Sequence, residues 1–209
     1  MINRRNDKDM KSLKIIFMGT PDFAVPMLDV LNKSIHEVIS VVTVADKPSG
    51  RGQKINTSAI KKYAEINKLQ LLQPINLKDQ LFVEKLKKLN ADLFVVVAFR
   101  MLPEMIWKLP SLGTINLHAS LLPQYRGAAP INWAIINGEK ETGVTTFFIE
   151  KEIDTGKIIN QLKTNISFEM TAGYLYLKLM NLGEELILKT VNNIAKNQIE
   201  PIAQEEIDS

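Results

Sequence analysis

The chain of 209 residues contains no cysteine and only two histidines, His36 and His118. Without cysteine it can form no disulfide bond, no catalytic thiolate and no metal site with cysteine ligands. Two histidines so far apart in the sequence also argue against a histidine-based metal cluster. We therefore expect no metal in this protein.

Long apolar runs are also missing. No stretch approaches the roughly 20 apolar residues that a membrane-spanning helix requires. The charged first ten residues, MINRRNDKDM, lack the apolar core of a signal peptide. The net charge of +3 is mild and says little about partners unless it is concentrated in one place. We expect a cytoplasmic protein with neither a membrane nor DNA as a partner.

The composition is that of one ordinary globular domain, with 45% hydrophobic and 23% charged residues. Regular patterning begins at Leu13, and neither a repeat nor a linker interrupts it before about residue 200. The sequence therefore predicts a disordered extension over 1–12, one domain over 13–200 and a tail over 201–209.

Apolar strand patterns alternate with amphipathic helical patterns along most of the chain. The predicted strands are 13–19, 38–45, 69–72, 91–99, 114–118, 142–149 and 157–165. The predicted helices are 23–31, 57–67, 77–89, 128–137 and a long last one, 171–196. This alternation is typical of an α/β, Rossmann-like, doubly wound and mainly parallel sheet. In such sheets ligands bind beyond the carboxyl ends of the strands.

The most informative stretch is 113–130, GTINLHASLLPQYRGAAP. Alternate strand residues share a face, so Asn116 and His118 should project together. Histidine carries protons near neutral pH, an amide can donate to an oxyanion, and Asp154 could orient the histidine. A lone strand histidine is more often structural, so spacing alone leaves both interpretations open. Ser120 and Thr155 complete this polar set.

A basic segment over 46–54 carries Lys47, Arg51 and Lys54 among glycine and proline residues. We expect it to hold neither a strand nor a helix. It is either a solvated connection or a mobile loop that binds phosphates through its cations. We expect the remaining histidine, His36, to be a solvated loop residue without a role.

Several motifs together resemble the 10-formyltetrahydrofolate-dependent formyltransferases, over roughly residues 13–199. They are Asn116-x-His118-x-Ser120-Leu121-Leu122-Pro123-x-x-Arg126-Gly127, Asp154-Thr155-Gly156, and the segments 17–24, 46–54 and 127–131. Within that family the likeness is greatest to members that act on methionyl initiator tRNA.

The resemblance implies a cytoplasmic monomer that uses 10-formyltetrahydrofolate and no metal. The implied catalytic residues are Asn116 and His118, which stabilise the oxyanion, and Asp154, which assists His118 and proton transfer. The implied folate contacts are Ser120, Leu121, Leu122, Pro123, Val97, Phe99, Leu102, Pro103 and Ile153. The implied contacts to the tRNA acceptor end are Lys47, Arg51 and Lys54.

Two departures from the family pattern are visible. Arg100 stands where the family often has glycine, so the folate rim should differ there. Full-length members carry a C-terminal β-barrel domain that contacts tRNA, and we expect that this chain lacks it. Two alternative acceptors, glycinamide ribonucleotide and a sugar nucleotide, remain open within the family. A non-catalytic RNA-binding module on the same scaffold is an alternative of another class.

Overall fold

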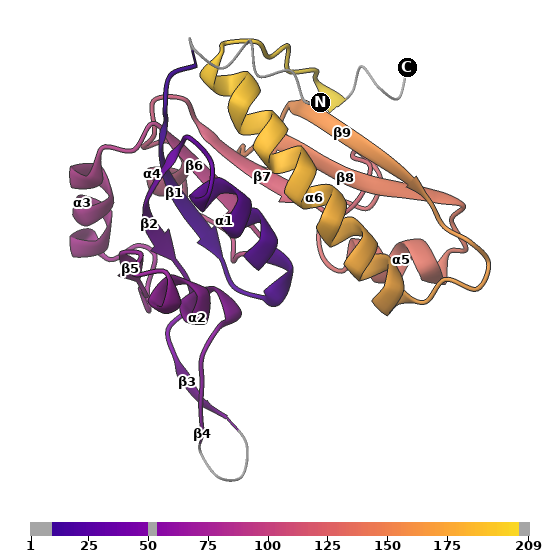
Figure 1. Cartoon of the computed structure of the whole chain (residues 1–209), viewed down its shortest axis with the longest axis horizontal. Helices are drawn as coiled ribbons and strands as arrows, with labels where there is room; N and C mark the ends of the chain where they lie inside the picture. Colours follow the sequence, from indigo (N-terminus) through magenta and orange to yellow (C-terminus); the bar gives the residue numbers. More distant parts are fainter. Residues whose placement is uncertain (1–9, 50–53, 205–209) are drawn as a thin grey trace.

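A mixed sheet organises the chain (Figure 1). Within residues 10–49 and 54–204, which the computed structural model describes, seven strands lie in the order β5-β2-β1-β6-β7-β8-β9. They are β1 (Lys14–Gly19), β2 (Glu37–Val42), β5 (Leu71–Leu72), β6 (Leu93–Val97), β7 (Thr114–His118), β8 (Glu141–Phe148) and β9 (Ile158–Asn165). The first five pair in parallel, and β8 and β9 pair antiparallel. The predicted doubly wound, mainly parallel sheet is confirmed.

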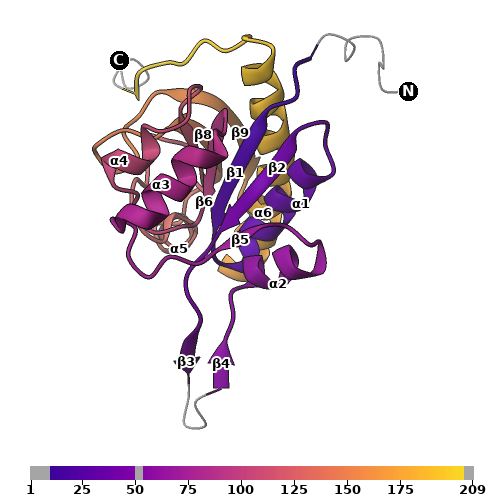
Figure 2. The same cartoon turned by 90° about the vertical axis from the view of Figure 1, so that its left-hand side faces the viewer.

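Helices cover both faces of the sheet (Figure 2). One layer contains α1 (Val25–Asn32), α2 (Ala59–Ile66), α5 (Pro130–Ile136) and α6 (Ala172–Ala195), and a 3-10 turn (Asp22–Ala24) precedes α1. The other layer contains α3 (Gln80–Leu89) and α4 (Glu104–Trp107). Strand residues alternate between the two cores, Phe17 and Val95 facing the first layer and Met18 and Val96 the second. Burying each such side chain contributes roughly 1.5–3 kcal/mol.

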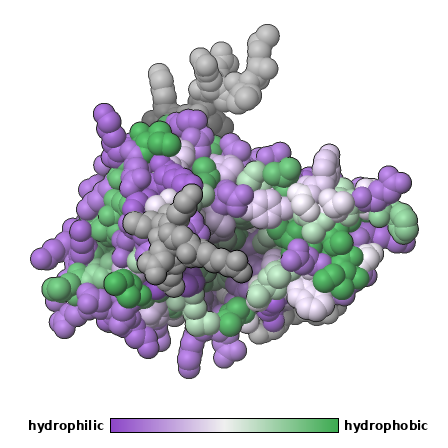
Figure 3. Space-filling model, turned by 90° about the horizontal axis from the view of Figure 1, so that it is seen from below, coloured by the Kyte–Doolittle hydropathy of each residue, from purple (hydrophilic) through white to green (hydrophobic). Residues whose placement is uncertain are grey.

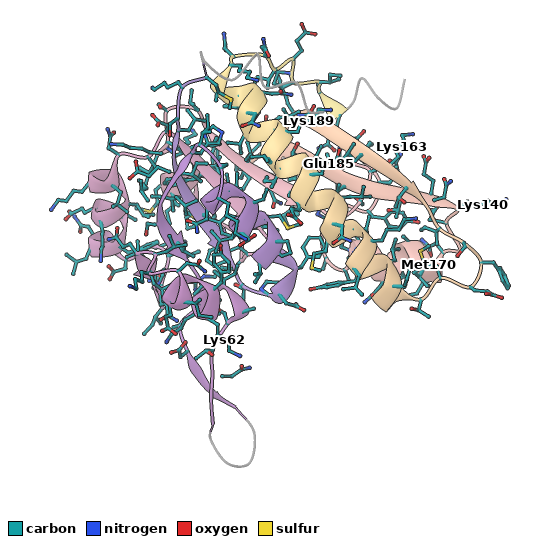
Figure 4. The ribbon with its side chains drawn as sticks, viewed as in Figure 1. Lys62, Lys140, Lys163, Met170, Glu185 and Lys189 are labelled. Carbon is teal, nitrogen blue, oxygen red and sulfur yellow. The ribbon has the colours of Figure 1, made fainter. Side chains whose placement is uncertain are left out.

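The long last helix, α6, confirms the pattern predicted for 171–196. Thr171 caps it by accepting a hydrogen bond from the backbone N–H three residues later, at 3.3 Å. Glu185 and Lys189 lie on its solvent face (Figure 4), while Leu186 is buried against the sheet. Among the helices of the described residues, α6 included, none is long and apolar enough to cross a membrane.

The basic segment contains strands, which contradicts the prediction for 46–54. β3 (Lys47–Ser49) pairs antiparallel with β4 (Lys54–Asn56), and the hairpin projects away from the body (Figures 1 and 2). A two-stranded ladder leaves one edge of each strand free, and proline is tolerated at such an edge. The presence of Pro48 therefore did not exclude a strand.

His36 is buried, at 5% exposure, so the prediction of a solvated loop residue is wrong. The backbone N–H of Leu13 donates to its Nδ1 at 3.2 Å, so its Nε2 carries the proton and donates to Asn192 Oδ1 at 2.9 Å. Burial lowers the pKa of His36, and the hydrogen bond to Asn192 partly offsets this. The residue ties the start of β1 to α6 at the amino edge of the sheet.

The carboxyl ends of β1, β6 and β7 meet at one edge, because their registers place Gly19 beside Val97 and Val97 beside Leu117. β8 runs the other way, and Phe148 at its end pairs with Ile115. The segment after β8 therefore starts near the beginning of β7. It has to fold back along the sheet to reach the carboxyl edge.

Candidate functional site

A cavity of about 780 Å³ lies beside the carboxyl ends of β6 and β7. Figure 3 views the molecule from this edge and shows hydrophobic surface gathered among hydrophilic surface. The walls come from β7, from Pro21 and Phe23 after β1, from the start of α6, and from the segments 98–102, 127–132 and 149–154. The volume lies within the range of about 300–1,000 Å³ that small-molecule sites have.

Asn116 projects into this cavity from the centre of β7. Its neighbours Ile115 and Leu117 point to the opposite core, as strand alternation predicted. The Oδ1 atom of Asn116 is buried and has no hydrogen-bond partner within the described residues. An unsatisfied buried polar group costs about 1–3 kcal/mol, so its presence at a cavity favours a ligand that pairs with this amide.

His118 shares that face and is 8% exposed. Its Nε2 lies 2.8 Å from the carbonyl oxygen of Tyr125, which can only accept, so Nε2 is the donor. Its Nδ1 lies 3.6 Å from Oδ2 of Asp154. Nδ1 is therefore the ring nitrogen at which His118 can gain or lose a proton beside a carboxylate.

Asp154 reaches His118 because the segment after β8 folds back over the sheet. The backbone N–H of Gly127 donates to Oδ2 of Asp154 at 2.8 Å. A Cβ atom on Gly156 would lie only 1.8 Å from the carbonyl oxygen of Phe148, so glycine alone permits this close return. The structure thus brings together all three predicted catalytic side chains from 116–118 and 154.

Backbone strain is concentrated around the cavity. Ala98, Ala129 and Asp154 line it with φ values of 47°, 56° and 53°, and Tyr125 beside His118 has a φ of 59°. Left-handed backbone costs a non-glycine residue roughly 1–2 kcal/mol. Residues of this kind cluster at functional sites, where the surrounding structure holds them in place.

The predicted folate wall is only partly in the cavity. Phe99, Leu102 and Ile153 line it. Val97 is fully buried in the core of the α1 and α6 face, and Pro103 caps α4 outside the lining. A folate contact by any of the five stays a prediction.

The predicted folate loop over 120–123 is also described in full, and none of its residues lines the cavity. These residues were Ser120, Leu121, Leu122 and Pro123. Ser120 is buried and donates to the carbonyl of Gln124 at 2.6 Å, and Leu122 packs against Phe147. The loop thus supports the turn that presents the Tyr125 carbonyl to His118, and its contact with folate stays a prediction.

Arg100 lines the cavity and connects two segments at its rim by hydrogen bonds. Its guanidinium donates to the carbonyl of Ile75 at 2.9 Å and to that of Pro74, and lies 5.6 Å from the centroid of the Phe99 ring. Its Nε is buried and has no partner within the described residues, and burial lowers the pKa of Arg100. The side chain joins the segment before α3 to the rim after β6.

Two of the three predicted tRNA-binding residues lie on the hairpin strands, Lys47 on β3 and Lys54 on β4, and Arg51 lies outside the described residues. Asp46, at the base of the hairpin, pairs with Lys61 and accepts from Gln73 Nε2 at 3.0 Å. The bond from Lys61 holds the pKa of Asp46 below its usual value. The hairpin base is therefore fixed to the body.

Sequence reasoning missed several contributors to the site. Tyr176 lines the cavity from α6 and donates to Asp22 Oδ1 at 2.6 Å; burial and this carboxylate raise its pKa. Helical spacing alone does not indicate that a tyrosine on α6 lines the cavity or bonds to Asp22. The Tyr125 carbonyl is a backbone group without any residue signature. Within the described residues there is no group of three His, Cys, Asp or Glu side chains that could hold a metal ion.

Comparisons with known proteins give the family of this chain. The family described as "Formyl transferase" matches residues 13–191, which include every strand of the sheet and the cavity. Over 198 residues the chain is 58% identical to a methionyl-tRNA formyltransferase of Flavobacterium psychrophilum. The alignment covers 94% of this chain and 63% of that relative. The chain spans about three fifths of the length of the curated relatives it matches.

Solved structures give the same fold. An N-formyltransferase from Helicobacter canadensis, in complex with folinic acid and dTDP-3-aminofucose, is 27% identical with a TM-score of 0.72, covering 94% of this chain and 69% of that chain. Glycinamide ribonucleotide transformylase 1 from Symbiobacterium toebii is 15% identical with a TM-score of 0.75, covering 91% and 94%. The second likeness concerns the fold alone.

Proposed function

The chain belongs to the formyl transferase family, and on that premise we propose that it transfers a formyl group from 10-formyltetrahydrofolate to the α-amino group of methionyl initiator tRNA. Relatives at 53–58% identity that carry the name methionyl-tRNA formyltransferase support this acceptor. The observation that carries the proposal is the Asn116 amide, with its unpaired Oδ1, in the same cavity as the His118–Asp154 pair.

The residues of the cavity suit a folate. Its volume of about 780 Å³ accommodates a flat heterocycle, and Phe99, Leu102 and Ile153 supply apolar surface for one. When bound, the folate supplies the formyl carbon as an activated amide. The unpaired Oδ1 of Asn116 can accept a hydrogen bond from a ligand, and the Nδ2 of the same amide can donate to the formyl oxygen as it becomes negative.

We assign His118 and Asp154 to the proton transfers that accompany attack by the amine. The incoming amine must be neutral to attack the formyl carbon, and free α-amino groups have pKa values of about 7.7–8.0. As the new C–N bond forms, the amine nitrogen becomes acidic, and we assign Asp154 as the base that takes its proton. The nitrogen of the folate takes one proton as its bond to the formyl carbon breaks, so no net proton is needed.

The Tyr125 carbonyl assigns distinct tasks to the two ring nitrogens of His118. Because Nε2 donates to that carbonyl, only Nδ1 can donate toward the formyl oxygen. The 3.6 Å separation between Nδ1 and Asp154 Oδ2 is too long for a hydrogen bond. Catalytic hydrogen bonds are often long without substrate and shorten in its complex, so an N–H at Nδ1 can be shared between substrate and carboxylate.

We further propose that the projecting hairpin contacts the acceptor end of the tRNA. It extends beyond the edge of the sheet at which the cavity lies and carries Lys47 and Lys54, with Arg51 in the connecting segment. Cations that contact phosphates give a binding constant that falls steeply with salt. A cytoplasmic location, a monomeric state and a catalytic unit over 13–200 stay predictions that belong to this proposal.

One assay tests the acceptor. Purified protein is supplied with 10-formyltetrahydrofolate and, in parallel, methionyl initiator tRNA, glycinamide ribonucleotide or an amino sugar nucleotide. We expect formylation of the tRNA-bound methionine, with kcat/KM at least about tenfold above either alternative, equal to about 1.4 kcal/mol. Preference for the ribonucleotide or the sugar would overturn the acceptor, and binding of RNA without any formylation would favour the non-catalytic module.

A further inference from the structure

We propose that Gln204 is a positioning residue for formyl transfer, because its side chain joins the two loops that hold the His118–Asp154 pair. The inference rests on the proposed function for the reaction that it affects. Gln204 lies beyond α6 and beyond residues 13–191, which the family match spans. The sequence predicted a tail from residue 201 onward and gave no reason to assign this residue a role.

The amide of Gln204 uses both its donors and its acceptor. Its Nε2 donates to the carbonyl oxygens of Asp154 and Gly156, each at 2.8 Å. Its Oε1 accepts from Nε and Nη2 of Arg126 at 2.8 and 2.5 Å. The residue is 3% exposed, so these bonds form away from bulk water. A group that donates twice on one side and accepts on the other has to be an amide here.

The two loops that Gln204 joins are those on which the catalytic pair depends. Arg126 stands between Tyr125, whose carbonyl holds Nε2 of His118, and Gly127, whose N–H holds Oδ2 of Asp154. On the other side Gln204 fixes the backbone of Asp154 itself. The separation between His118 and Asp154 is therefore set by the loop contacts that converge on one amide.

Asp154 needs such support because its φ of 53° is costly for a residue with a side chain. A displacement of about 1 Å at a reacting group can cost on the order of a hundredfold in rate. The segment that carries Gln204 is itself fixed, since Ile158 and Ile202 exchange backbone hydrogen bonds of 2.8 and 2.9 Å. The segment that carries Gln204 is thus anchored to Ile158 of β9 two residues before Gln204, which suits a residue that positions another.

The test compares wild type with Gln204→Ala, which removes every bond, and Gln204→Glu, which keeps the acceptor for Arg126 and removes both donors. We expect kcat for formyl transfer to fall by about 10–100-fold in both variants, with KM for the folate changed by less than about twofold. Ile202→Ala is the matched control, because this neighbour pairs through its backbone and its side chain is half exposed. It should retain wild-type kcat.

A second readout does not depend on activity. The chain has two histidines, so their imidazole resonances can be assigned by NMR with one substitution each. In the Gln204 variants we expect the His118 resonances to shift while those of His36, at the other edge of the sheet, stay unchanged and report an intact fold. Unchanged His118 resonances together with unchanged kcat would overturn the proposal.

Two further outcomes are also decisive. If both Gln204 variants lose the His36 signature, Gln204 supports the fold and the proposal is wrong. If wild type formylates no methionyl initiator tRNA, the proposed function fails, while the His118 resonances still decide whether Gln204 positions the pair.

Discussion

Each histidine lies at one edge of the parallel sheet. His36 immediately precedes β2 at the amino edge, and His118 ends β7 at the carboxyl edge. Both are buried, at 5% and 8% exposure, and both ring nitrogens of each face a polar group. Burial and polar contacts alone therefore do not distinguish a structural histidine from a catalytic one.

The partners of the two rings do distinguish them. His36 faces one donor, the Leu13 N–H, and one acceptor, Asn192 Oδ1, so a neutral ring satisfies both. His118 faces two acceptors, the Tyr125 carbonyl and the Asp154 carboxylate, so a neutral ring can satisfy only one. A ring between two acceptors beside a cavity suits proton exchange, whereas a ring between a donor and an acceptor suits a fixed bridge.

The largest effect should come from His118→Ala. Losing the ring to which we assign proton transfer should lower kcat for formyl transfer by up to about 10⁴-fold, because general acid–base groups contribute about 10²–10⁴. Thermal unfolding should change little, since the lost side chain lines a cavity that water can enter. Steady-state kinetics and a melting curve on the same preparation measure both.

The contrasting variant is His36→Ala, which should show the reverse: kcat per folded molecule near that of wild type and a lower melting temperature. Equal kcat in wild type and His118→Ala would remove the distinction between the two edges and with it the proposed mechanism.

The next effect concerns the two asparagines that accompany the histidines. Asn116→Ala removes the cavity amide whose Nδ2 is proposed to donate to the oxyanion, and it should reduce turnover by about 10²–10³-fold, the usual cost of one such donor. Asn192→Ala removes only the partner of His36 and should leave turnover unchanged. If both substitutions lower turnover alike, the Asn116 amide has no special part in the reaction.

The local sequence pattern predicted which side chains lie at the carboxyl edge of the sheet, but it did not predict the contacts between residues far apart in the sequence. Strand alternation was enough to predict that Asn116 and His118 share a face. The order of strands and helices was enough to predict a mainly parallel sheet. The partners of His36 come from residues 23 and 156 positions away, and such pairings exist only in the folded chain. The contact of the Tyr125 carbonyl with His118 and the contacts of Gln204 could not be predicted for related reasons. A backbone oxygen has no residue signature, and Gln204 stands outside any patterned element.

A smaller effect, on stability alone, is expected for His36→Gln. This substitution leaves either the Leu13 N–H or the Asn192 amide without its partner in a buried position. We expect the free energy of unfolding to fall by about 1–3 kcal/mol. Urea unfolding at pH 8 measures the loss, and a variant as stable as wild type would show that the bridge at the amino edge contributes nothing.

The smallest effect is the pH dependence that His36 confers. Burial lowers its pKa in the folded state below the ordinary value of 6.5, so the unfolded chain binds a proton more readily. Its contribution to stability is therefore fully present above about pH 6.5 and is lost as the pH falls through the lowered pKa. Urea unfolding of wild type and His36→Gln at pH 8 and pH 5 should show a larger loss on acidification in wild type. Equal losses of unfolding free energy in the two proteins would mean that protonation of His36 is not coupled to unfolding. The hydrogen bonds of His36 would then not depend on a neutral ring.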